Sequence, residues 1–104
     1  MNQKKSRISI NKRANKRLKE LYLKEATIYC EARLPGCMIN FGLSWHHRHK
    51  RLWYYDKPED LLSDFNQTIL VCTNCHGKVE RDKELNNKTF KRLRGDELPI
   101  VQKT

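Results

Sequence analysis

Four cysteines form two pairs whose spacing could hold one metal ion. Cys72 and Cys75 have the Cys-x-x-Cys spacing, which lets two thiolates occupy one side of a tetrahedral ion. Cys30 and Cys37 flank a Pro35-Gly36 turn, which brings the ends of their wider gap together. We therefore predict a closed, structural Zn²⁺ site made by all four thiolates, whose binding energy contributes to folding. Buried free thiols or disulfides are the alternative.

Three histidines could serve a second metal centre. His46 and His47 are adjacent, and His76 directly follows the Cys-x-x-Cys pair. A neutral imidazole accepts a proton near neutral pH and is a common ligand of divalent ions. Taken singly, the adjacent pair could be surface residues, and His76 could be the fourth ligand of a zinc site with three cysteines. Taken together, with the cysteine pairs on both sides of the His-His pair, the three histidines favour a hydrolytic centre with its own ion.

The charge of the chain points to a polyanionic partner. The 104 residues fit one domain and contain 22 Lys and Arg against 12 Asp and Glu, a net charge of +10. Residues 1–24 hold nine of the basic residues and one acid, Glu20, so this segment carries +8 of the +10. Nucleic acid is the first expectation for such a segment, and a solubilising tail is the alternative.

Hydropathy predicts neither a membrane segment nor a secretion signal. The sequence has no stretch that is long and apolar enough to span a bilayer, and no apolar segment follows the basic N-terminus. We expect an intracellular protein without a membrane partner, in the cytoplasm of a bacterial cell, with a phage among the compatible sources. Thiols stay reduced in that compartment, which favours metal over disulfides.

The elements that position these residues follow from apolar spacing. Residues 1–10 are polar and basic and predict a disordered arm. Asn11 could cap a helix that runs to about residue 28 or 29, with one buried stripe and a basic outer surface. Residues 41–48 predict a strand or hairpin that leads into the His-His pair, and residues 50–57 predict a loop. A short helix could begin at Pro58.

In the second half of the chain we expect one strand, one helix and a C-terminal tail. The β-branched run 68–71 predicts a buried strand, and a helix is expected to follow it to about Lys83. Phe90 and Leu93 are the last apolar anchors, and residues 95–104 predict a loose tail. The expected fold is a small, zinc-stabilised α+β domain over residues 11–94.

Three runs resemble a known family. The segments 30–37, 45–48 and 69–76 are together similar to HNH endonucleases with an embedded zinc site. The resemblance covers residues 30–80, and its specificity lies in the order of the motifs and the 28 residues between His47 and His76. It implies a ββα-metal core, here preceded by a basic helix. It also implies metal-dependent hydrolysis of DNA phosphodiester bonds, leaving 5′-phosphate and 3′-hydroxyl ends.

The resemblance assigns roles to single residues. His46 and His76 would bind the catalytic ion, and His47 would be the general base. Glu80 stands where some members of the family have a further ligand, one helical turn after His76, although a solvated glutamate is the ordinary alternative. The ion could be Mg²⁺, Mn²⁺, Ni²⁺ or Zn²⁺, because so few ligands do not select one.

The middle residue of the motif departs from the family pattern. Asparagine is expected five residues before the first cysteine of the Cys-x-x-Cys pair, but that position is Gln67, preceded by Asn66. Either amide could accept a hydrogen bond from one nitrogen of His47 and leave the other nitrogen as the base. Asn66 is the preferred candidate.

Double-stranded DNA is the expected partner, and cationic side chains are the expected contacts. They follow the His-His pair and lie along the N-terminal helix: Arg48, Lys50, Arg51, Lys12, Arg13, Lys16 and Arg17. With one active site per chain, a double-strand break requires a homodimer or two visits, and a larger phage or defence complex is also compatible. The rival hypothesis is a non-catalytic zinc module that binds nucleic acid and does not need His47.

Overall fold

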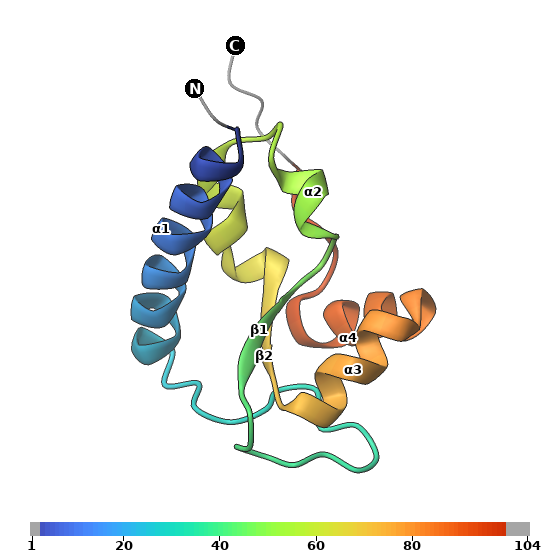
Figure 1. Cartoon of the computed structure of the whole chain (residues 1–104). Coiled ribbons are helices and arrows are strands. Elements are labelled where there is room, and N and C mark those ends of the chain that lie inside the picture. Colours follow the sequence, from blue (N-terminus) through green and yellow to red (C-terminus); the bar gives the residue numbers. More distant parts are fainter. Residues whose placement is uncertain (1–2, 100–104) are drawn as a thin grey trace.

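The backbone combines helices with one small sheet. A computed structural model describes residues 3–99, and within this range the chain has four α-helices, two 3-10 helices and one two-stranded antiparallel sheet (Figure 1). Helix α1 covers one side of the sheet, and α3 and α4 lie on the other side. The predicted α+β class is therefore confirmed. No helix within the described range is long and apolar enough to cross a bilayer.

The sheet carries the His-His pair. Strand β1 (Ser44–His47) pairs with β2 (Thr68–Val71), with Trp45 opposite Leu70 and His47 opposite Thr68. The predicted strand over residues 68–71 is confirmed, whereas the strand expected over 41–48 is shorter. Because successive side chains of a strand point to opposite faces, His46 and His47 face different neighbours.

Helix α1 begins earlier than predicted. It spans Gln3–Lys24, so the expectation of a disordered arm over 1–10 and a helix start at Asn11 is wrong for the described residues, and residues 1–2 lie outside them. Tertiary contacts explain the difference. Ile10 packs against a buried cluster, and Asn11 donates from Nδ2 to the Tyr55 hydroxyl at 2.9 Å. The side chain that suggested a cap therefore serves as a packing contact in the middle of the helix.

The buried stripe of α1 ties the helix to the rest of the chain. Ala14 packs with Tyr54 and Leu62, while Leu18 and Tyr22 pack against Leu70 of β2. The helix ends at Lys24, before the predicted boundary, and Ala26 has a positive φ of 55° that helical backbone does not adopt.

Short helices connect the two strands. The loop predicted over 50–57 contains one helical turn, α2 (Arg51–Tyr54), because Tyr54 is buried and its hydroxyl donates to Gln67 at 2.8 Å. Two 3-10 helices follow, η1 (Glu59–Ser63) and η2 (Phe65–Gln67). Pro58 precedes the first of them, close to the predicted helix start.

Two helices follow the second strand. Helix α3 (Thr73–Arg81) ends two residues before the predicted boundary, and α4 (Lys83–Arg94) was not predicted at all. Asp82 accepts a hydrogen bond from the Leu85 amide and starts α4, and Phe90 is fully buried in the core. Residues 95–98 are not loose as expected, because Asn66 bonds to their backbone; residues 100–104 lie outside the described range.

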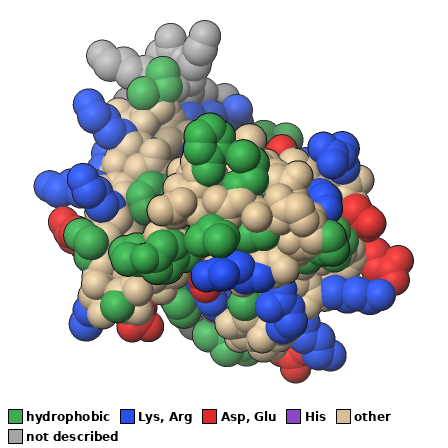
Figure 2. Space-filling model, turned by 90° about the horizontal axis from the view of Figure 1, so that it is seen from below, with side chains coloured by type: hydrophobic (Ala, Val, Ile, Leu, Met, Phe, Trp, Pro, Cys, Tyr) green, Lys and Arg blue, Asp and Glu red, His purple; other side chains and the backbone are tan. Residues whose placement is uncertain are grey.

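One end of the molecule is apolar on its surface. Figure 2 looks at the end formed by the connection between α1 and β1, and hydrophobic side chains are prominent on it. That connection contributes five exposed apolar residues: Ile28, Tyr29, Met38, Ile39 and Phe41. This end is therefore distinct in character from the outer surface of α1, where exposed lysines and arginines predominate.

Candidate metal centres

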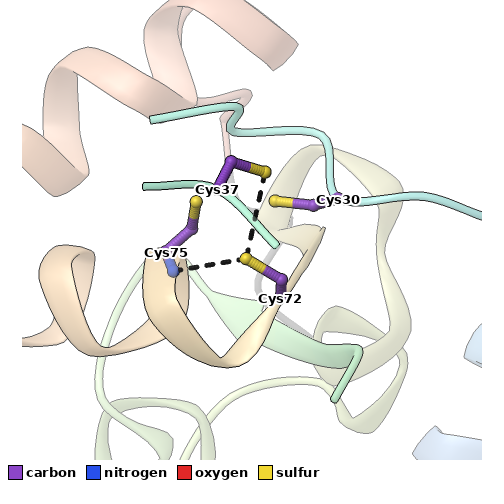
Figure 3. A group of neighbouring side chains, drawn as sticks. All are labelled: Cys30, Cys37, Cys72 and Cys75. Atoms are coloured by element: carbon purple, nitrogen blue, oxygen red, sulfur yellow. Dashed lines mark hydrogen bonds between the residues drawn. The ribbon is translucent and has the colours of Figure 1, made fainter. Parts of the chain in front are cut away.

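The four cysteines converge on one point. Their sulfur atoms all lie within 4.8 Å of one another, and the Sγ atoms of Cys37 and Cys72 are 3.9 Å apart. Figure 3 shows Cys30 and Cys37 entering from the loop, and Cys72 and Cys75 entering from the start of α3. A tetrahedral ion with Zn–S bonds of about 2.3 Å requires sulfur atoms about 3.8 Å apart. The cluster could therefore hold a metal such as zinc.

The turn between the first two cysteines explains how a wide gap can supply adjacent ligands. The Cys37 amide donates to the Leu34 carbonyl at 2.9 Å, and the Cys30 amide donates to the Ile39 carbonyl at 2.6 Å. Gly36 has a φ of 84°, which favours glycine, and a Cβ there would lie 3.1 Å from the Asn74 side chain. The loop is thus folded against the first turn of α3.

Backbone amides favour the thiolate form of one ligand. Cys72 caps α3 and accepts hydrogen bonds from the amides of Met38 at 3.3 Å and Cys75 at 3.5 Å. Burial raises the pKa of Cys72, but these amides, together with hydrogen bonds from the thiols of Cys75 and Cys30, outweigh burial and bring the pKa to about 6. Burial raises the pKa of Cys75 to about 12. A thiolate at Cys72 is the charge state that a metal ion requires.

A second group of side chains that could bind a metal ion lies between β1 and α3. His46, His76 and Glu80 each offer a donor atom, and these atoms lie within 4.8 Å of one another. The rings of His46 and His76 are 5.1 Å apart, and Nε2 of His76 lies 3.1 Å from Oε1 of Glu80. Burial lowers the pKa of His46, so its imidazole is neutral and has a lone pair for a ligand bond. The three residues could hold one divalent ion.

His47 has the protonation state of a base. It is 7% exposed, and its Nε2 lies 2.8 Å from the Leu62 carbonyl. A carbonyl oxygen only accepts, so Nε2 carries the hydrogen and Nδ1 has the lone pair. Burial lowers the pKa of His47 to about 4, so the ring is neutral at physiological pH. It lines the same open cleft as His46 and His76.

The amide predicted to orient His47 lies elsewhere. Asn66 donates to the Asp96 carbonyl at 3.2 Å and accepts from the Leu98 amide at 3.1 Å, so it anchors the segment after α4. The expectation that Asn66 bonds to His47 is therefore wrong. Its side chain leaves η2 toward that segment, and the Leu62 carbonyl takes the place at the ring.

Gln67 does not bond to His47 either. Its Oε1 accepts from the Tyr54 hydroxyl at 2.8 Å, and its Nε2 donates to Glu97 at 2.7 Å. Glu97 also lies 2.7 Å from Nε2 of His49, whose ring stacks on Trp53. His49 is thus half-buried at the edge of the cleft.

The cations predicted to follow the His-His pair differ in their exposure and in their hydrogen bonds. Lys50 is exposed and lines the cleft, as does Arg51, which donates to Asn11 at 2.9 Å. Arg48 is half-buried, and its guanidinium donates to the carbonyls of Asn66 at 3.0 Å and Gly95 at 3.3 Å. The guanidinium of Arg48 therefore bonds to the backbone of two other segments, whereas the sequence suggested only a contact to DNA.

The predicted cations of α1 also fall into two kinds. Arg13 and Arg17 both pair with Glu59, at 2.6 and 3.3 Å. Lys12 and Lys16 are exposed. The ammonium groups of the two lysines lie on exposed side chains, whereas the two guanidinium groups form ion pairs with a carboxylate of η1.

Two polar residues beside the imidazoles were missed by the sequence analysis. Ser44 Oγ lies 2.7 Å from Nδ1 of His76, and Asn86 Oδ1 lies 2.6 Å from Nε2 of His46. Ser44 stands two residues before His46, so strand alternation could have placed both on one face. Asn86 lies 40 residues from His46 on an unpredicted helix, and no local signal connects them.

Comparisons with known protein families, with curated proteins and with solved structures found no match for this chain. What the site can do is therefore inferred from its own geometry. Within the described residues it offers a four-sulfur centre, a separate group of two imidazoles and a carboxylate, and a neutral histidine in the same cleft.

Proposed function

We propose that this chain is a metal-dependent DNA endonuclease of the HNH type. In this proposal β1, β2 and α3 correspond to a ββα-metal core. One observation carries it: the donors of His46, His76 and Glu80 lie within 4.8 Å of one another in a cleft that is also lined by the neutral imidazole of His47. Hydrolysis of a phosphodiester needs this combination of a cation site and a base.

The base acts through one nitrogen. With Nε2 of His47 held by the Leu62 carbonyl, Nδ1 accepts a proton from the attacking water. The water oxygen forms a bond to phosphorus, and the bond from phosphorus to the 3′ oxygen breaks. That oxygen then takes a proton from solvent, which gives the ends expected from the family resemblance. A divalent ion at the three ligands would bind the phosphate and offset the charge that develops on the leaving oxygen.

The zinc ligands give the cleft its shape. Cys72 and Cys75 begin the helix that carries His76 and Glu80, and their partners Cys30 and Cys37 lie in the loop before β1. An ion at the four sulfurs would fasten that loop to the start of α3. It would thereby hold the imidazole of His76 opposite β1, without any part in the reaction.

Exposed cations supply the contacts to the DNA backbone. Lys50 and Arg51 lie along the cleft, and Lys12 and Lys16 project from α1. Contacts of this kind give affinity that falls with salt and does not depend on sequence. Duplex DNA is the proposed substrate, with single-strand nicking as the product of one visit.

A plasmid-nicking assay tests the proposal. Zinc-loaded protein is incubated with supercoiled DNA and Mg²⁺, Mn²⁺ or Ni²⁺, and relaxed circles are measured. We expect His47→Ala to reduce the nicking rate by a factor of about 10² or more, the usual contribution of a general base. DNA affinity and zinc content should remain. His47→Gln is the second variant, since its amide can still donate to the Leu62 carbonyl.

His49→Ala is the matched control. His49 lies two residues further on, lines the same cleft and stands outside the ligand group, so its loss should leave the nicking rate nearly unchanged. Full activity of His47→Ala and His47→Gln would refute the assignment of the base. Wild-type protein that binds DNA but never nicks it with any of these ions would favour the non-catalytic zinc module instead.

A further inference from the structure

A buried amide on α4 contacts a ligand of the cleft ion. Asn86 is 7% exposed, and its Oδ1 lies 2.6 Å from Nε2 of His46. The amide is held at its other end, because Nδ2 donates to the Arg48 carbonyl at 3.1 Å. That second bond fixes which end of the amide faces the ring. Helix α4 lies outside residues 30–80, and the proposed reaction does not use it.

The contact selects one form of the imidazole. An amide oxygen only accepts hydrogen bonds, so Nε2 of His46 must carry the hydrogen. In the neutral ring Nδ1 is then the nitrogen with a free lone pair, and it is the atom that can bind a cation. A partner of this kind commonly fixes the tautomer and the orientation of a histidine that binds a metal.

The neighbouring contact at His76 is less selective. Ser44 Oγ lies 2.7 Å from Nδ1 of His76, but a hydroxyl can either donate or accept. Ser44 is therefore compatible with both tautomers of His76, whereas Asn86 is compatible with one tautomer of neutral His46. Of the two contacts, only the one between Asn86 and His46 selects a single tautomer of the imidazole.

We infer that Asn86 is a positioning residue, which holds His46 in the tautomer and orientation that offer Nδ1 to the divalent ion of the cleft. This inference rests on the ion site of the proposed function and not on DNA cleavage. It makes α4 part of the site: the helix delivers one amide to the strand that carries the ligand. Loss of such a partner weakens metal binding by about 10- to 100-fold.

The test measures ion binding directly. Mn²⁺ is titrated into the zinc-loaded chain, and free Mn²⁺ is measured by its electron paramagnetic resonance signal. Mn²⁺ is the probe because it prefers oxygen and nitrogen donors over thiolates. Asn86→Leu should weaken Mn²⁺ binding by about 10- to 100-fold. Asn86→Asp loses the donor to the Arg48 carbonyl but keeps an acceptor toward His46, and it should therefore bind Mn²⁺ more tightly than Asn86→Leu does. Zinc content should be equal in all of these proteins.

Thr89→Val is the matched control. Thr89 is also buried on α4, and its hydroxyl donates to the Leu85 carbonyl, away from the ligands. Its Mn²⁺ affinity should be unchanged. An equal loss in Thr89→Val and Asn86→Leu would reduce the effect to helix stability and overturn the inference.

Ring-nitrogen NMR of the manganese-free protein provides a second measurement. His46 should carry its hydrogen on Nε2 in the wild type and lose that preference in Asn86→Leu. Wild-type Mn²⁺ affinity and an unchanged tautomer in Asn86→Leu would overturn the positioning role, as would a wild type that binds no Mn²⁺. If the wild type binds Mn²⁺ and Asn86→Leu does not, but neither protein nicks DNA, the positioning role holds and the endonuclease proposal fails.

Discussion

Cys72 has two functions at the start of α3. It is one of the four converging sulfurs, and it is the N-cap that accepts a hydrogen bond from the Cys75 amide. Its pKa of about 6 indicates that it is the most readily ionised of the cysteines whose shifts are resolved. A substitution there removes both a helix cap and one of the four sulfurs that could hold a metal ion.

We predict that Cys72→Ala loses zinc and unfolds at 25 °C. Small metal-dependent folds bind their ion as part of folding, so loss of a ligand removes a large share of the free energy of unfolding. Metal analysis and circular dichroism measure the two effects. Asn74→Ala is the control: it removes one exposed hydrogen bond to the Pro35 carbonyl and should cost about 1 kcal/mol with zinc retained. Folded wild-type protein without metal would contradict the zinc assignment.

The sequence predicted which cysteine and histidine side chains converge better than it predicted the groups that bond to them. The cysteines and histidines carry their chemistry in their own side chains, and short spacings limit where they can lie. The partner of His47 is a main-chain carbonyl, which has no sequence signal. Asn66 was misassigned because its partners come from residues 94–98, about 30 positions away, and nothing local links the two segments.

Helix α1 depends on its buried stripe. Leu18 is fully buried and packs beside Tyr22 against Leu70 of β2. We predict that Leu18→Ala lowers the free energy of unfolding by about 2–5 kcal/mol, as a large-to-small change in a core does. Urea denaturation of the zinc-loaded protein measures the loss. Lys19→Ala, at the exposed neighbouring position, should change stability by less than about 0.5 kcal/mol.

Helices α1 and α4 were predicted wrongly for different reasons. Helix α1 runs past Asn11 because tertiary contacts outweigh a local capping signal. Helix α4 was missed because its sequence is mainly polar, with Asn86, Asn87 and Thr89 in its middle and few apolar residues at helical spacing. Its buried side includes two polar residues that bond to partners distant in the chain or to the helix backbone, which a hydrophobic pattern does not reveal. The strand over 68–71 was predicted correctly because it is buried along its whole length.

The molecule as a whole has an uneven surface. Exposed lysines project from α1, while the connection before β1 exposes apolar side chains (Figure 2). If α1 lies along DNA, its lysines contribute affinity through the release of counterions. The arginines paired with Glu59 contribute less, because a carboxylate already lies beside them.

We predict that the double variant Lys12→Ala, Lys16→Ala weakens binding to all duplex sequences alike. The slope of log affinity against log salt should fall by roughly 2, about one for each lost phosphate contact. Fluorescence anisotropy at several salt concentrations measures the slope. Lys88→Ala removes another exposed lysine, which pairs with Glu84 on α4, and should leave the slope unchanged. An unaltered slope in the double variant would remove α1 from the DNA-binding surface.

The adjacency of Cys75 and His76 in α3 would link the two candidate metal centres thermodynamically. An ion on the sulfurs would order the turn that presents the imidazole, so a second ion would bind to a site that is already organised. Linkage is reciprocal in binding free energies, so a second ion that binds more tightly to the zinc-loaded chain must also tighten the binding of zinc. At equilibrium, a chromogenic chelator should remove less zinc when millimolar Mn²⁺ is present, and His76→Ala should abolish that protection.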